Sequence, residues 1–322
     1  DLKFDKDSVF LVTGGAGFIG SNLVHRLVRE GQAVRVFDDL SSGRLINLAG
    51  IEDKVDFVQA DLRDLAAVRE AMRGVRYVFH FGALASVQAS VDDPLRTHDI
   101  NVTGTLNVLV AARDAAVQRV VFASSASVYG DSPIMPKRED MLPQPQTGYA
   151  LSKLAGEHYG RIFYERYGLP FVALRFFNVF GPRQDPASHY ASAIPLFMRA
   201  YSTGRQPTIY DDGEQTRDFT YVEDVVAANL ACLTAPEGAI GGVYNIAYGD
   251  RVSVNELARQ IAALAGQPFA PMYAPPRPGD IRESQADASL ARRVLNWQPT
   301  HTFADGLRTT YDWFKGQSAA KE

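Results

Sequence analysis

In Val9-Phe10-Leu11-Val12-Thr13-Gly14-Gly15-Ala16-Gly17-Phe18-Ile19-Gly20, an apolar strand runs directly into a glycine-rich turn. Apolar residues at helical spacing follow, at Leu23, Val24, Leu27 and Val28. The spacing Gly14-x-x-Gly17-x-x-Gly20 permits a tight turn and lets a pyrophosphate approach the N-terminus of that helix. This order of strand, turn and helix predicts a dinucleotide site, with Phe18 and Ile19 in the first helical turn.

A second predicted strand, residues 33–37, ends at Asp38 and Asp39. A carboxylate at this place can accept hydrogen bonds from a ribose 2′-hydroxyl and would repel a 2′-phosphate. The acidic pair therefore favours NAD over NADP as the dinucleotide. A glycine-rich turn without a ligand is the alternative, and the presence of strand, helix and acid together weighs against it.

Strands and helices alternate through the first half of the chain. Apolar strands are predicted at 55–58, 77–81, 119–123 and 171–175, with helical patterns between them, notably at 97–114 and 148–167. Because such alternation is typical of a parallel sheet covered on both faces, we predict an α/β protein with a Rossmann-type, doubly wound parallel sheet. Ligands of such sheets bind beyond the carboxyl ends of the strands. The sequence places at those ends Asp61, Phe81, Gly82, Ala83, Ser124, Ser125 and Asn178.

After residue 180, prolines and glycines become frequent and the helical patterns become shorter. We expect residues 1–180 to form the dinucleotide-binding domain and residues 181–322 to form mainly a smaller, C-terminal substrate lobe. The two parts are interleaved if residues 243–247 return to the sheet as a strand. In the second part, Ser253 and Glu256 have the spacing of a capping box that opens a helix.

A further pair of motifs concerns proton transfer. Tyr149 and Lys153 are four residues apart, which on a helix places the phenol and the ammonium on one face. A phenol has an ordinary pKa of roughly 10, and a neighbouring cation favours its ionised form. A hydroxyl from Ser125 can share a proton with a substrate oxygen. The three side chains suit proton movement at a carbinol carbon, and an exposed helical pair is the alternative for Tyr149 and Lys153.

Composition argues against several other classes of protein. The 322 residues carry a net charge of -4, which gives no reason to expect binding to nucleic acid or to an anionic membrane. No stretch approaches the ~20 apolar residues of a membrane span, and no signal-peptide pattern begins the chain. The single cysteine, Cys232, cannot form an internal disulfide and argues against a structural metal site. We expect it to be a small buried hydrophobe in a cytoplasmic protein.

Taken together, the motifs resemble the extended short-chain dehydrogenase/reductase family, and within it the nucleotide-sugar 4-epimerases of UDP-hexoses and UDP-N-acetylhexosamines. The matches, in chain order, are Gly14-x-x-Gly17-x-x-Gly20, Ser125, Tyr149-x-x-x-Lys153 and the segments 175–184, 212–219 and 277–280. They cover nearly the whole chain. The resemblance implies NAD as the cofactor and a UDP-sugar as the substrate.

The resemblance also implies a role for individual residues. The expected catalytic residues are Ser125, Tyr149 and Lys153. Contacts with NAD are expected from Gly14, Gly17, Phe18, Ile19, Gly20, Asp38, Asp39, Asp61, Leu62, Phe81, Gly82, Ala83, Asn101, Ser124, Tyr149 and Lys153. Contacts with the UDP-sugar are expected from Ser86, Ser125, Ser127, Asn178, Ala193, Ile194, Tyr210, Arg217, Arg277, Asp280 and Ser284.

Two of the expected substrate ligands make chemical sense on their own. Arg217 and Arg277 suit a diphosphate, because a guanidinium matches phosphate oxygens bidentately. Ion pairs of these arginines with Asp218 and Asp280 are the alternative. For Asn178 the alternative is a residue of an Asx turn.

The turn after Ser125 separates the reactions of the family. Related dehydratases and decarboxylases carry acidic residues where this chain has Ala126 and Ser127, so the chain lacks the acid–base pair that elimination needs. The resemblance therefore implies NAD-dependent 4-epimerisation through a transient 4-keto sugar. A keto-sugar reductase and a non-catalytic NAD-sensing protein are the alternatives. The acidic pair after the second strand argues against the first, and the retained catalytic residues argue against the second.

The resemblance extends to the sugar and to assembly. Ser284 aligns with the family position where a small residue admits an N-acetyl group, so both UDP-glucose/UDP-galactose and UDP-N-acetylglucosamine/UDP-N-acetylgalactosamine are expected. Arg183 supports an alternative, UDP-glucuronate, whose carboxylate it could meet. The family commonly forms homodimers through two helices per subunit, here 97–114 and 148–167, which would give a four-helix interface.

Overall fold

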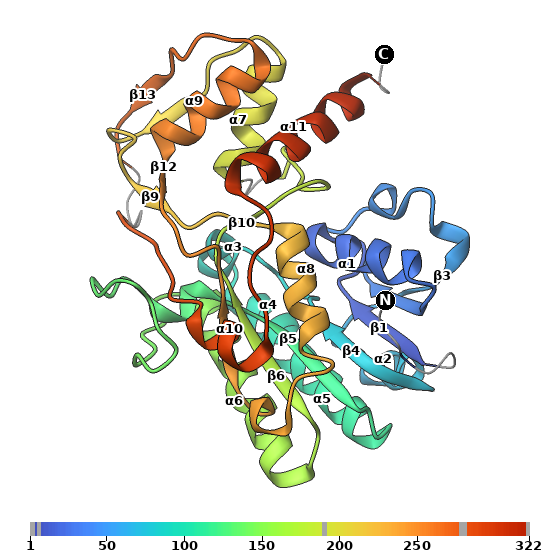
Figure 1. The fold of residues 1–322 in the computed structure, drawn as a ribbon. Helices are drawn as coiled ribbons and strands as arrows, with labels where there is room; N and C mark the ends of the chain where they lie inside the picture. The colour runs from blue at the N-terminus through green and yellow to red at the C-terminus, as the bar shows by residue number, and fades with distance from the viewer. Residues whose placement is uncertain (1–3, 5–7, 189–191, 277–281, 320–322) are drawn as a thin grey trace.

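The molecule is built on a parallel sheet (Figure 1). The computed structural model describes residues 4, 8–188, 192–276 and 282–319. In this part of the chain the sheet has seven strands in the order β11-β6-β5-β4-β1-β2-β3, all paired in parallel. The strands are β1 (Val9–Thr13), β2 (Ala33–Asp38), β3 (Val55–Gln59), β4 (Val75–His80), β5 (Arg119–Ser125), β6 (Phe171–Phe176) and β11 (Val243–Ile246). The order reverses between β1 and β4, which confirms the predicted doubly wound sheet.

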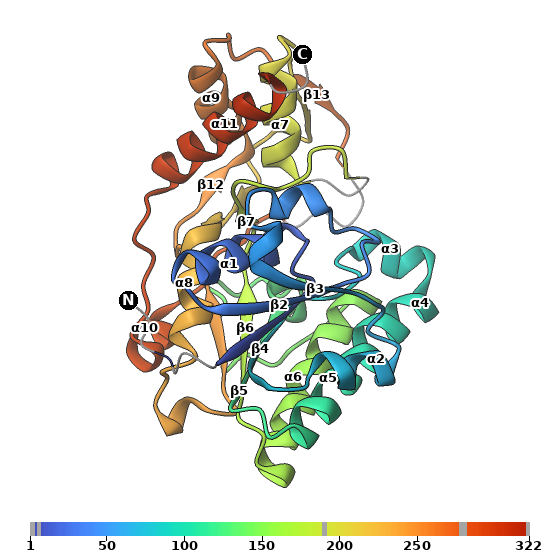
Figure 2. The same cartoon turned by 90° about the vertical axis from the view of Figure 1, so that its right-hand side faces the viewer.

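Helices cover both faces of the sheet, as Figure 2 shows. One face carries α1 (Phe18–Arg29) and α8 (Val222–Ala231), and the other carries α2 (Leu65–Ala71), α5 (Gly104–Asp114) and α6 (Gly148–Tyr167). Successive side chains of a strand point to opposite faces. Phe10 and Val12 of β1 accordingly belong to the first core, and Leu11 belongs to the second. Burial on both sides explains why these strands are apolar without alternation.

The helix predicted at 97–114 is a composite of three segments. α4 (Pro94–His98) continues through a π-helical turn, Asp99–Thr103, into α5. A π-helical turn is a local widening that often occurs at functional sites, and here it buries Asn101. α6 has the predicted bounds, because the Thr147 hydroxyl caps its first turn and Gly168 ends it in a left-handed conformation.

A smaller lobe occupies the top of Figure 1. It contains α7 (Ala193–Ser202), α9 (Val254–Ala265), α11 (Phe303–Ala319) and the parallel pair β8 (Thr208–Tyr210) and β13 (Met272–Ala274). Its own core includes Met198, Ile209, Leu257 and Leu307. The chain is interleaved between the two parts, because β11 pairs with β6 and α10 (Ser289–Leu295) packs back on the core beneath α8.

Short strand pairs connect the sheet to the lobe. β7 (Val179–Phe180) pairs in parallel with β10 (Thr220–Tyr221), and β9 (Thr216–Arg217) pairs with β12 (Val252–Ser253) in antiparallel fashion. A helical segment α3 (Val87–Asp92) follows the loop after β4.

Two local predictions can be compared with the structure directly. The Ser253 hydroxyl accepts the backbone N–H of Glu256 at 3.1 Å, as in a capping box, but the Glu256 carboxylate accepts from the side chain of Gln260 instead of returning to the cap. Cys232 is fully buried, as predicted. Among the described helices, none is both long and apolar enough to cross a membrane.

Candidate active site

The glycine turn leaves no room for side chains. Gly14 has a φ of +66°, and a Cβ there would lie 2.8 Å from the backbone N of Gly82. A Cβ on Gly20 would lie 2.2 Å from the carbonyl oxygen of Gly14. Gly17 precedes the first residue of α1 and has no side chain to cap the helix. The turn thus brings backbone close to whatever sits at this helix N-terminus, which fits a pyrophosphate. Phe18 and Ile19 are partly buried there, packed against the core of the lobe.

The structure separates the two acids that follow β2. Asp38 is buried, and its carboxylate accepts the backbone N–H groups of Ala16 in the glycine turn and of Leu40, each at 2.9 Å. Burial raises the pKa of Asp38, and the two N–H bonds oppose that rise. Asp39 is exposed and accepts from the backbone and the hydroxyl of Ser41. Asp38 is therefore the acid that faces the glycine turn.

Asp61 and Leu62 follow β3. The Asp61 carboxylate is bonded to the backbone N–H and the guanidinium of Arg63, and this arginine lowers the pKa of Asp61. The Leu62 side chain is buried, and its carbonyl accepts the amide of Asn107 at 2.8 Å. A Cβ on Gly82 would lie 2.8 Å from the Leu62 side chain, so these two predicted residues are neighbours.

The loop after β4 holds Phe81, Gly82 and Ala83, which are partly exposed. Asn101 fixes this loop from the π-helical turn. Its amide accepts from the Leu84 backbone N–H at 2.8 Å and donates to the Ser152 hydroxyl on α6 at 3.0 Å. Asn101, a predicted NAD contact, is buried, and its side chain joins the loop after β4 to α6.

A buried histidine that the sequence reasoning missed connects these parts. The Thr13 hydroxyl accepts the Gly82 N–H at 3.0 Å and contacts His80 Nδ1 at 2.6 Å. His80 Nε2 contacts the Thr105 hydroxyl at 2.9 Å, and that hydroxyl donates to the Asn101 carbonyl at 2.6 Å. One tautomer satisfies every group, with the proton on Nε2. Burial lowers the pKa of His80 to about 3, so the ring is neutral.

The three predicted catalytic side chains come together from two elements. Ser125 ends β5, and Tyr149 and Lys153 lie on the first two turns of α6. The Ser125 side chain lies beside the Tyr149 hydroxyl, close enough to lower the pKa of Tyr149. Lys153 Nζ donates to the Ala123 carbonyl at 2.8 Å and lies 5.8 Å from the centre of the Tyr149 ring.

Burial disfavours the charged forms of both Tyr149 and Lys153. Burial raises the pKa of Tyr149, and the neighbouring Ser125 side chain partly offsets that rise. Burial also lowers the pKa of Lys153 to about 8. Lys153 alone therefore does not make Tyr149 a base at neutral pH, and a further positive charge beside the phenol would favour its ionised form.

The predicted sugar contacts nearest the trio are serines. The Ser127 hydroxyl is buried and has no hydrogen-bond partner among the described residues. The Ser127 backbone N–H donates to Ser125 Oγ at 3.1 Å. Ser86 is buried and caps α3 by accepting the Ala89 N–H at 3.0 Å. The hydroxyl of Ser124, a predicted NAD contact, donates to Glu157 at 2.6 Å.

The remaining predicted substrate residues come from the smaller lobe and the segments leading to it. Asn178 is exposed at the end of β6, in a left-handed conformation with φ of +34°. Tyr210 ends β8, and Arg217 in β9 donates to the Thr216 carbonyl at 2.8 Å. Ser284 is partly buried, two residues before Ala286, which forms an isolated β-bridge with Lys137.

Where they are described, the remaining residues singled out by the sequence contact other parts of the protein. Ala193 starts α7 and is half-buried, but Ile194 is 1% exposed inside the lobe core, so its side chain packs against protein. Arg277 and Asp280 lie outside the described residues. The Arg183 guanidinium donates to Asn22 on α1 at 2.8 Å.

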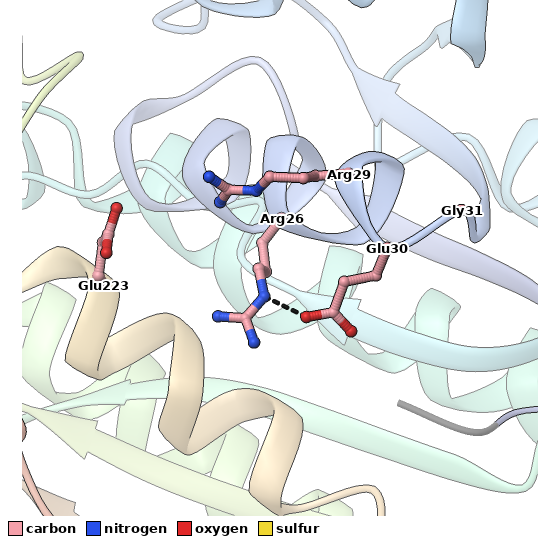
Figure 3. A pocket seen from close by; sticks show the side chains of 5 residues that line it. All are labelled: Arg26, Arg29, Glu30, Gly31 and Glu223. Carbon is pink, nitrogen blue, oxygen red and sulfur yellow. Dashed lines mark hydrogen bonds and ion pairs between the residues drawn. The ribbon is translucent and has the colours of Figure 1, made fainter. Parts of the chain in front are cut away.

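A surface hollow of about 660 Å³ lies away from this site, at the end of α1 (Figure 3). Arg26 and Glu30 form an ion pair there, and Glu223 at the start of α8 lines the other side. None of the residues predicted to bind ligands lines this hollow. Since its charged groups come from exposed helix ends, it offers no built site.

Known proteins match the chain over nearly its full length. Residues 10–247 match the NAD dependent epimerase/dehydratase family. A UDP-glucose 4-epimerase of Mycolicibacterium smegmatis is 42% identical over 313 residues, covering 96% of this chain and 99% of that protein. The solved UDP-N-acetylglucosamine 4-epimerase from Methanobrevibacter ruminantium M1, in complex with UDP-N-acetylmuramic acid, has a TM-score of 0.92 at 40% identity, covering 97% of this chain and 100% of that one. The solved UDP-glucose 4-epimerase of Thermus thermophilus, in complex with NAD, has a TM-score of 0.86 at 38% identity, covering 96% of this chain and 99% of that one.

These matches confirm the resemblance drawn from the motifs, the Rossmann-type fold and the prediction of an enzyme that uses NAD. The glycine turn and Asp38 provide the close backbone and the acid that such a dinucleotide needs. On its matched residues and on its relatives, the chain belongs to the NAD-dependent epimerase/dehydratase family.

Proposed function

We propose that the protein interconverts the 4-epimers of a UDP-sugar, with NAD held in the site. The observation that carries this proposal is the Ser125 side chain beside Tyr149, with Lys153 Nζ 5.8 Å from the centre of the Tyr149 ring, in a turn that offers no carboxylate. Oxidation and re-reduction at one carbon need one acid–base group, whereas elimination of water needs a second. Ala126 and Ser127 stand where that second group would have to be.

In this proposal each side chain has one task. Tyr149 removes the proton of the sugar 4-hydroxyl and later returns it, while Ser125 donates a hydrogen bond to the 4-oxygen. Lys153 stabilises the phenolate. When bound, NAD would supply the hydride acceptor and donor for carbon 4 and, in its oxidised form, a positive charge. The 4-keto sugar must turn over between the two steps, so the sugar is held loosely and Arg217 is assigned to the diphosphate.

We assign NAD to residues 1–180 and the UDP-sugar mainly to residues 181–322. For NAD, Gly14 and Gly20 exclude side chains from the turn, and Asp38 points at it. For the sugar, the unpartnered hydroxyl of Ser127 beside Ser125 supports a polar ligand at this point. Arg277 and Asp280 remain expected ligands of the nucleotide.

For the sugar itself we favour both UDP-glucose and UDP-N-acetylglucosamine, with their 4-epimers. Relatives named for each of these substrates match the chain at 40% identity or more. Ser284 is small, which is compatible with an acetamido group at the gate. The contact of Arg183 with Asn22 weakens the case for UDP-glucuronate, because it directs that guanidinium toward α1.

We also infer a cytoplasmic homodimer. Large apolar side chains are exposed on adjacent helices, with Val91 on α3, Leu95 on α4 and Leu151 on α6 each more than half exposed. Such a patch suits burial against a second copy. We therefore place the interface on α3, α4 and α6 instead of on residues 97–114 and α6, because much of α5 is buried in the sheet core.

The test is a panel of UDP-sugars incubated with the purified protein and analysed for the 4-epimer. We expect turnover of UDP-glucose and UDP-N-acetylglucosamine without added NADPH. Tyr149→Phe should lower kcat by about 10² or more, the scale for a positioned acid–base group, with substrate affinity nearly unchanged. Near-normal turnover in that variant would refute the assignment of the base. Turnover of UDP-glucuronate alone would replace the proposed substrate.

A further inference from the structure

A buried row of polar side chains lies beneath the turn formed by residues 125–129, here called the catalytic turn. Ser124 of β5, Arg175 of β6 and Asn245 of β11 are direct neighbours in the sheet register. In parallel strands, residues paired in this way project on the same face. All three are buried, among strand residues that are mostly apolar. They thus form a polar line across three strands.

An ion pair connects this row to the catalytic helix. The Arg175 guanidinium donates to both carboxylate oxygens of Glu157, at 2.8 and 2.7 Å, and both side chains are 4% exposed. Glu157 lies on α6 one turn after Lys153 and two turns after Tyr149. The Ser124 hydroxyl donates to the same carboxylate at 2.6 Å. The residue before Ser125 is thereby tied to the helix that carries the other two catalytic side chains.

The far end of the catalytic turn is tied to the same row. The Arg175 guanidinium stacks 4.7 Å from the centre of the Tyr129 ring. The Tyr129 hydroxyl donates to Asn245 Oδ1 at 2.6 Å. Asn245 in turn donates to the carbonyls of Lys137 and Asp287, the latter three residues beyond Ser284. The turn is therefore held at both ends by one cluster.

Burying this ion pair is unfavourable in itself, because desolvation of two charges can exceed their attraction. A pair of apolar side chains would fill the space without that penalty. The ion pair instead contributes directional hydrogen bonds. Its bidentate geometry and the hydroxyls around it permit only one arrangement of the catalytic turn. This points to a role in geometry rather than in stability.

We propose that Glu157 and Arg175, through Ser124 and Tyr129, are positioning residues that hold the catalytic turn, residues 125–129, against Tyr149. The inference rests on the proposed 4-epimerase function. It predicts that loosening either end of the turn lowers the rate of the chemical step while substrate binding is retained.

The experiment uses variants that leave the ion pair intact. Ser124→Ala removes the hydroxyl at one end of the turn, and Tyr129→Phe removes the hydroxyl at the other end. Tyr244→Phe is the matched control, because the Tyr244 hydroxyl is also buried and donates to the Ala239 carbonyl at 3.0 Å, outside the cluster. For each protein, kcat and KM for UDP-glucose and UDP-N-acetylglucosamine are measured, together with amide hydrogen exchange of peptides covering 124–130.

We expect Ser124→Ala and Tyr129→Phe to lower kcat about tenfold or more, since small misplacements of catalytic groups are costly. Their KM should stay within about twofold of wild type by the same argument, because only the turn moves. Exchange should be faster at 124–130, and Tyr244→Phe should match wild type in kcat and in exchange at 124–130. Unchanged kcat or unchanged exchange in both cluster variants would overturn the inference, as would an equal loss of kcat in Tyr244→Phe. If the wild type turns over neither sugar, the proposed function fails, and exchange alone then decides whether the turn is clamped.

Discussion

Lys153 illustrates how a single residue ties function to a stability penalty. Its side chain is 5% exposed, and burial lowers its pKa from 10.5 to about 8. The ammonium donates a hydrogen bond to the backbone carbonyl of Ala123 and lies 5.2 Å from the centre of the Phe122 ring. No carboxylate is hydrogen-bonded to it in the described residues. The charge that serves Tyr149 is thus held in surroundings that disfavour it.

This gives a pH dependence of stability with a definite sign. Between pH 8 and 10.5 the unfolded chain binds a proton at Lys153 that the folded chain has released. The contribution of this residue to the free energy of unfolding should therefore rise with pH across that window, by at most about 1.4 kcal/mol per pH unit. Urea unfolding of the wild type and of Lys153→Met, at matched NAD content, measures it. The difference between the two proteins should grow in favour of the wild type from pH 8 to pH 9.5. A constant difference would show that folding does not lower the pKa of Lys153.

Ser284 offers a prediction about specificity at the same scale. A bulky aromatic ring there should fill the volume that an acetamido group needs, at a cost of about 1–3 kcal/mol. Ser284→Tyr should selectively lose UDP-N-acetylglucosamine and keep UDP-glucose. The measurement is the ratio of kcat/KM for the two substrates in both proteins. An unchanged ratio would mean that Ser284 is not the gate.

Among the elements, α6 matters most, because it carries Tyr149, Lys153 and Glu157 on one face and must lie close to the sheet. Its glycines allow this approach. A Cβ on Gly156 would lie 2.3 Å from the Phe122 ring, and one on Gly160 would lie 2.1 Å from the Phe171 ring. Both rings are buried and packed on their neighbours, so they cannot move aside freely. The close packing sets the height of the catalytic side chains above β5.

Gly160→Ala should therefore destabilise the protein, although alanine is the better helix former. Overpacking costs about 1–3 kcal/mol, which should outweigh a helix-propensity gain of about 1 kcal/mol. Gly316→Ala is the matched control, because Gly316 lies in α11 with nothing within 4 Å of an added Cβ. Urea unfolding should show a lower free energy of unfolding for the first variant and an equal or higher one for the second. Stabilisation by both substitutions would contradict the packing argument.

At the scale of the whole molecule, the apolar patch on α3, α4 and α6 leads to a prediction about assembly. Leu95 is 79% exposed, and Leu151 on the neighbouring α6 is 57% exposed. Leu95→Glu would place a charge in the proposed interface, where an unpaired charge is strongly disfavoured. Light scattering should give twice the chain mass for the wild type and the mass of one chain for the variant. Met272→Glu, on the exposed β13 of the other lobe, is the control and should leave the mass unchanged. A monomeric wild type would refute the dimer.

The sequence alone determined the features that depend on neighbouring residues. Strand, turn and helix at the N-terminus, the alternation that builds the sheet, the bounds of α6 and the facing of Tyr149 and Lys153 follow from short-range hydrogen bonding and from apolar periodicity. The glycine pattern could be interpreted from the sequence because each glycine is required by local backbone geometry, such as the φ of +66° at Gly14.

Which distant polar groups meet depends on the packing of the whole fold. It places Asp38 rather than Asp39 against the glycine turn and directs the Arg183 guanidinium to α1. It also buries Asn101 within a π-helical turn and brings the Ser124 hydroxyl to Glu157. The Tyr129 hydroxyl finds Asn245 across 116 residues of chain. Such contacts depend on strand order and register, which are set by how the whole sheet packs. A local sequence pattern does not specify which residue of a distant strand will lie beside it.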